Sequence, residues 1–70
     1  MPLVLAPINQ KLEIIKILSD DNTKRHLQNL GFVVGQELEV LSSSNGDIIV
    51  KLKESRLALD KNTALKIIVR

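Results

Sequence analysis

The sequence predicts a mainly β domain, a small bent barrel of about five short strands with one short α-helix. Residues 37–41 alternate polar and apolar side chains, residues 47–53 form the partner strand, and an Asn45-Gly46 pair suited to a tight hairpin stands between them. Seventy residues make a single domain that spans 1–70. Because strands this short leave exposed edges, closure of the sheet into a barrel is favoured.

The first part of the chain predicts a strand followed by the helix. Residues 11–18 are rich in β-branched side chains and end in a polar cluster at 19–22. The helix is expected over 23–30, where Leu27 and Leu30 form one narrow apolar edge that faces the core. An isolated helix shorter than ~12 residues is marginal, so tertiary packing must hold this one.

The ends of this helix have clear signals. Asp20 and Asp21 are expected to serve as N-cap and first-turn charges that complement the helix dipole. Gly31 is expected to end the helix in the left-handed conformation, which glycine adopts without a steric cost.

The second half of the chain predicts further β-structure. A turn at 42–46 precedes a strand at 47–53, which places Ile48, Val50 and Leu52 on one face. The remaining predicted elements are a short connection at 54–55, a strand at 56–59, a turn or single 3₁₀ turn at 60–63 capped by Asp60, and a last strand at 65–69.

The composition excludes most catalytic chemistry. The chain has no cysteine, so disulfides, thiolate metal sites and cysteine nucleophiles are absent. His26 is the only histidine and stands on a charged helix face, so we interpret it as a solvated surface residue, with partner contact as the alternative. Scattered carboxylates do not suit a tight transition-metal site, so neither a cofactor nor a specific metal site is expected.

Other binding functions are also disfavoured. Phe32 is the only aromatic residue, so the chain lacks both the groove for proline-rich peptides and the stacking platforms for single-stranded nucleic acid, and we interpret Phe32 as core. The segment from Gly31 to Gly35 is not a phosphate-binding loop, because no lysine follows its second glycine. A net charge of only +2 is a weak indication of nucleic-acid binding. With no membrane-spanning run and no signal peptide, the expected location is the cytoplasm.

Several segments together resemble the FeoA family, small SH3-like barrels associated with bacterial ferrous iron uptake. In chain order they are Leu3…Leu5, Ile14-Ile15-x-Ile17, Arg25-x-Leu27-x-x-Leu30-Gly31-Phe32, Gly35 before Val40, Arg56-Leu57-Ala58-Leu59 and Ala64-x-x-Ile67-x-Val69. The resemblance implies a non-enzymatic, cytosolic accessory protein that contacts the membrane transporter FeoB, which has an intracellular GTP-binding domain.

Two other functions stay open. The first is an interaction or oligomerisation module related to the C-terminal domain of metal-dependent repressors, which would require a fused DNA-binding domain. The second is a small basic RNA-binding barrel, which would lose affinity steeply with salt. A homo-oligomer is compatible with all three functions.

The expected partner surface combines charge with apolar residues. If the pairs Ile15 and Ile17, Ile48 and Val50, and Ile67 and Val69 fill the interior, alternation places Ile14, Ile49 and Ile68 on the outer face of their strands. Alternatively, the N-terminal segment covers these isoleucines. The residues expected to contact a partner are Lys24, Arg25, His26, Ile49, Arg56 and Ile68.

Overall fold

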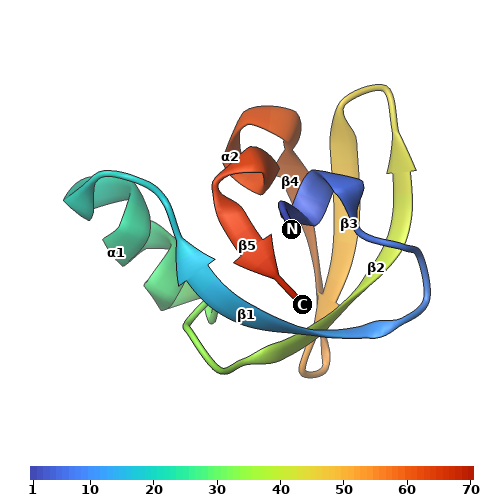
Figure 1. Cartoon of the computed structure of the whole chain (residues 1–70), viewed down its shortest axis with the longest axis horizontal. Helices are drawn as coiled ribbons and strands as arrows, with labels where there is room; N and C mark the ends of the chain where they lie inside the picture. The colour runs from blue at the N-terminus through green and yellow to red at the C-terminus, as the bar shows by residue number, and fades with distance from the viewer.

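The computed structural model describes all residues, 1–70, as one antiparallel sheet curled around a core (Figure 1). The sheet has five strands in the order β4-β3-β2-β1-β5. The elements are the 3₁₀ helix η1 (Leu3–Leu5), β1 (Lys11–Ile17), α1 (Asp21–Leu30), β2 (Glu37–Ser44), β3 (Asp47–Leu52), β4 (Ser55–Asp60), α2 (Lys61–Leu65) and β5 (Ile67–Val69). The predicted strands are therefore confirmed, and α2 and η1 are added to the one expected helix.

The core is entirely apolar, because each strand contributes its inward-facing residues and no buried polar side chain is present. Phe32, Ile14 and Val50 are among the residues with no exposed surface, which confirms Phe32 as core. Leu3 of η1 is buried as well, and η1 packs against α2 and β5. The N-terminal segment therefore packs over one end of the barrel.

The prediction of which β1 isoleucines face inward is right for Ile17, which is 5% exposed, and wrong for Ile14 and Ile15. Ile14 is fully buried, whereas Ile15 is 39% exposed. The register between β1 and β5 shifts between Ile14 and Lys16. An extra residue in a bulge changes the phase of alternation, so both Ile14 and Ile17 point inward although three positions separate them.

The ends of α1 match their predicted signals. The N-cap Asp20 accepts a hydrogen bond from the backbone N–H of Thr23 at 2.8 Å, and the first helical residue is Asp21. Gly31 has φ 104°, and its N–H donates to Gln28. Leu30 differs from the prediction, because it is 39% exposed and only Leu27 of this helix is buried.

Two turns and α2 shift the predicted boundaries. Strand β2 continues to Ser44, so only Asn45 and Gly46, both with positive φ, form the first hairpin turn. The second hairpin turns at 53–54 rather than 54–55. Asp60 caps a short α-helix rather than a 3₁₀ turn, and that helix includes Leu65, so β5 is shorter than predicted.

The two capping carboxylates make stability depend on pH. Hydrogen bonding from Thr23, first through its backbone N–H, lowers the pKa of Asp20, and hydrogen bonding from Thr63 through its side chain and backbone lowers the pKa of Asp60. A carboxylate with a lowered pKa in the folded state stabilises the fold above its unfolded pKa, near 3.8. This contribution is lost as the pH falls through the folded pKa.

We therefore expect the urea midpoint of unfolding to fall below about pH 4. In an Asp20→Asn, Asp60→Asn variant, which keeps two good capping residues, the fall should be shallower. Circular dichroism at a series of pH values measures both curves. Parallel curves would contradict the assignment of the acid sensitivity to these caps.

Candidate partner-binding surface

Helix α1 stands at one side of the barrel and presents most of its surface to solvent (Figure 1). Arg25 and His26 are exposed, and Lys24 is half-buried. Because Leu27 is the only buried residue of α1, the helix makes few contacts with the rest of the domain. The three basic or potentially basic side chains predicted to contact a partner therefore lie together on one accessible element.

Exposed apolar residues gather where α1 ends. Leu30, Val33 and Val34 are 39%, 38% and 63% exposed. Leu30 is the last residue of α1, and the two valines lie in the loop that follows it. The N–H of Gly35 donates to the carbonyl of Ile14 at 2.7 Å, which brings this loop against β1 next to the exposed Ile15. We name Ile15, Leu30, Val33 and Val34 the helix-end patch. Exposed apolar residues on adjacent segments are a feature of contact surfaces.

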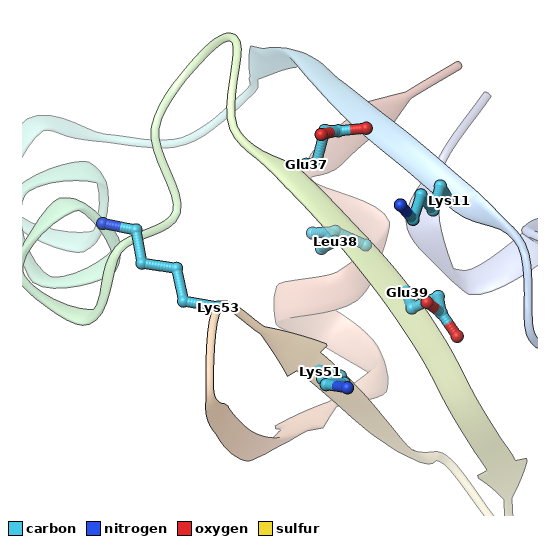
Figure 2. A pocket seen from close by; sticks show the side chains of 6 residues that line it. All are labelled: Lys11, Glu37, Leu38, Glu39, Lys51 and Lys53. Atoms are coloured by element: carbon cyan, nitrogen blue, oxygen red, sulfur yellow. The ribbon is translucent and has the colours of Figure 1, made fainter.

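The outer face of the sheet has a different character, because charged residues dominate it. Lys11 lies opposite Glu39, and Glu39 lies opposite Lys51, on three neighbouring strands. These residues line an open pocket of about 210 Å³ (Figure 2). The residues that line the pocket are Lys11, Glu37, Leu38, Glu39, Lys51 and Lys53.

This pocket offers little to a specific ligand. Its charges have both signs, and Figure 2 shows Lys53 pointing away from the other labelled side chains. The one ion pair of the structure lies elsewhere, between Arg70 Nη2 and Glu13 Oε1 at 3.2 Å. We therefore interpret the pocket as part of a solvated, charged sheet face.

The other predicted contact residues do not join α1 in one patch. Ile49 on β3 and Arg56 on β4 are diagonal neighbours on the outer sheet face, because Arg56 lies opposite Lys51. Ile68 is on β5, at the other end of the strand order, where it bridges to Pro2. The proposed six-residue surface is therefore split among α1, the β3-β4 face and β5.

The helix-end patch is what sequence reasoning missed. Ile15 and Leu30 both followed patterns that predicted burial, and the bulge and the helix stop expose them. A signal for Val33 and Val34 was present, because they stand between the helix stop at Gly31 and a second glycine at Gly35, a segment that forms a loop rather than a strand or helix.

The structure brings no group of three or more histidine, cysteine, aspartate or glutamate residues together in a way that could hold a metal ion. None of the helices is long and apolar enough to cross a bilayer.

The architecture defines a class, the small SH3-like barrels, and the comparisons identify the family within it. The model of the FeoA domain matches residues 1–70. The chain therefore belongs to the FeoA family, whose members are non-enzymatic accessory proteins of ferrous iron transport.

Individual relatives agree with this assignment. One relative is a Methanocaldococcus jannaschii protein whose name assigns it, by inference, as Fe(2+) transport protein A. It is 29% identical to this chain over 97% of this chain and 83% of its own length. The crystal structure of an iron uptake regulatory protein (FeoA) is 30% identical, with a TM-score of 0.88 over 99% of this chain and 92% of that chain. The zinc complex of Stenotrophomonas maltophilia FeoA, described as an SH3 domain protein, is 25% identical, with a TM-score of 0.81 over 100% of this chain and 89% of that one.

A manganese-dependent transcriptional repressor shares the fold at 20% identity, with a TM-score of 0.86, and this chain covers 39% of it. At that identity the likeness concerns the fold alone.

Proposed function

We propose that this chain is a cytoplasmic accessory protein of ferrous iron uptake that docks onto the cytosolic region of an FeoB-type transporter and its GTP-binding domain. Membership of the FeoA family supports the iron transport role. The observation that supports protein contact is the helix-end patch, since four exposed apolar side chains beside a basic helix suit a partner better than water.

In this proposal the two parts of the surface act differently. Lys24 and Arg25 steer the encounter with an acidic partner surface, because exposed charges act mainly on the association rate, and His26 beside them is a further contact. The helix-end patch supplies the buried centre, which governs how slowly the complex dissociates. The half-buried Ile49 and Ile68, together with Arg56, are secondary contacts outside this patch.

Binding kinetics with the purified cytosolic region of the transporter from the same cell test the proposal. Lys24→Glu with Arg25→Glu should slow association and reduce its dependence on salt. Val34→Lys should speed dissociation and leave the fold intact, because Val34 is 63% exposed.

Ile49→Lys and Ile68→Lys are comparison variants, because each places the same lysine at a secondary contact away from α1 and should therefore weaken binding less than Val34→Lys. Circular dichroism reports whether these two variants fold. If the transporter region does not bind, or if Val34→Lys binds like the wild type while Ile49→Lys does not, docking through the helix-end patch is wrong.

A further inference from the structure

Strand β4 has an unpaired edge. It lies at the end of the sheet, where β3 is its only neighbour. None of the backbone hydrogen bonds that turns, loops and caps make joins an edge-facing group of β4 to another segment. An edge of this kind is a template for a further strand unless it is blocked, and β4 contains neither proline nor a bulge.

The hairpin geometry determines which groups point to this edge. The two-residue turn at 53–54 makes Leu52 and Ser55 a hydrogen-bonded pair, and such pairs recur at every second position. Alternate residues of β4, beginning with Ser55, therefore bond to β3. The residues whose backbone groups point to the open edge are Arg56, Ala58 and Asp60.

The charges on β4 are poorly matched within one chain. Arg56 lies directly opposite Lys51, and Asp60 lies directly opposite Asp47. Like charges that face each other across strands are destabilising. The one ion pair of the structure involves none of these four residues, although the Asp60 carboxylate accepts a hydrogen bond from the Thr63 N–H at 2.8 Å.

We propose that β4 pairs antiparallel with β4 of a second copy of this chain, about a two-fold axis at Ala58. Antiparallel pairing places Arg56 opposite the partner's Asp60. Lys51 and Arg56 of one protomer, which face each other and are both positive, then lie in line with Asp60 and Asp47 of the partner subunit, which are both negative. Two-fold symmetry repeats this match, so the surface is self-complementary.

The hydrogen bonds and the apolar centre fit the same register. Ala58 and the partner's Ala58 exchange two backbone hydrogen bonds, and each Asp60 N–H donates to the other protomer's Arg56 carbonyl. Ile49 lies opposite Ala58 and is half-buried, so Ile49 and Ala58 of both protomers form an apolar row between the two charged rows. Ala58 adds no bulky side chain to this edge.

This self-association goes beyond the proposed function and does not depend on it, because it needs no transporter. Sedimentation equilibrium of the purified chain should show a concentration-dependent dimer of twice the 7.8 kDa monomer mass, weakened by salt. Arg56→Glu should raise the dimer Kd by about tenfold, since it places like charges at both symmetric contacts. Lys11→Glu makes the same charge change on β1 and should leave the Kd unchanged.

A single cysteine tests the register, because the chain has none of its own. Hydrogen-bonded partners in an antiparallel pair have Cα atoms about 5.5 Å apart, within reach of a disulfide. Mild oxidation of Ala58→Cys should therefore give a covalent dimer much faster than oxidation of Ser43→Cys, an exposed position on β2.

Ala58→Pro blocks the edge without touching the β3 ladder, because the N–H that it removes points outward. Circular dichroism should show a folded protein, and sedimentation should show a monomer. A wild-type chain that stays monomeric to millimolar concentration would overturn the proposal. So would a dimer that is unchanged in both Arg56→Glu and folded Ala58→Pro, or an Ala58→Cys variant that cross-links no faster than Ser43→Cys.

Discussion

Replacing Phe32 by alanine is expected to destabilise the protein by about 3–5 kcal/mol, the usual cost of removing a large buried aromatic side chain. Phe32 has no exposed surface and is the largest fully buried side chain. A domain of this size has a free energy of unfolding of about 4–10 kcal/mol, so a large fraction of the variant should be unfolded at room temperature. Urea unfolding followed by far-ultraviolet circular dichroism measures this loss.

Two control variants separate cavity formation from other effects. Phe32→Leu keeps most of the apolar volume and should lose much less stability. Val34→Ala, two residues away and 63% exposed, should unfold like the wild type. A Phe32→Ala protein within about 1 kcal/mol of the wild type would show that the surrounding core collapses to fill the space.

Gly31→Val is expected to lose about 2–4 kcal/mol, because two effects add at this position. The backbone has φ 104°, a conformation that a β-branched residue adopts only with strain. An added Cβ would also lie 2.8 Å from Cδ2 of Leu52, which is part of the core. Thermal and urea unfolding both measure the change.

Gly35 provides a matched control for the second effect. Its φ is 93°, close to that of Gly31, but an added Cβ would meet no atom within 4 Å. Gly35→Ala should therefore show the backbone strain alone, and Gly31→Ala should be less stable than Gly35→Ala. Equal losses would mean that Leu52 moves aside freely, and the expected effect of Gly31→Val would then reduce to backbone strain.

The features predicted correctly are those that short segments determine. Asp20 caps α1, Gly31 ends it at positive φ, and Asn45 with Gly46 forms a hairpin turn. Each depends on the hydrogen bonds or the conformational freedom of a few neighbouring residues. The alternating strand at Ile48, Val50 and Leu52 is also local, since period-two alternation can be read directly from the chain.

The errors occur where distant segments meet. Ile14 and Ile15 exchange their expected places because β1 changes partner along its length, from β2 to β5, and a bulge absorbs the mismatch. Leu65 belongs to α2 rather than to the last strand, since the Asp60 cap starts a helix that packs against η1. Neither outcome is visible in a short window of sequence.

The candidate surfaces also combine features that are local in the sequence with features that depend on distant segments. Lys24, Arg25 and His26 could be placed on one helix from sequence, but Ile49 and Ile68 could not be placed relative to each other without the strand order. The helix-end patch depends on the contact between the loop after α1 and β1, and the facing like charges of Lys51 with Arg56 depend on which strands are neighbours.

The sequence by itself therefore determined the class of fold, the ends of α1, the hairpin turn at 45–46, and the resemblance that predicted the family. Only the tertiary structure decided which isoleucines are buried, which charges face each other and which strand is left with an open edge. The physical reason is range: caps and turns depend on a few adjacent residues, whereas register and edges depend on pairings between segments far apart in the chain.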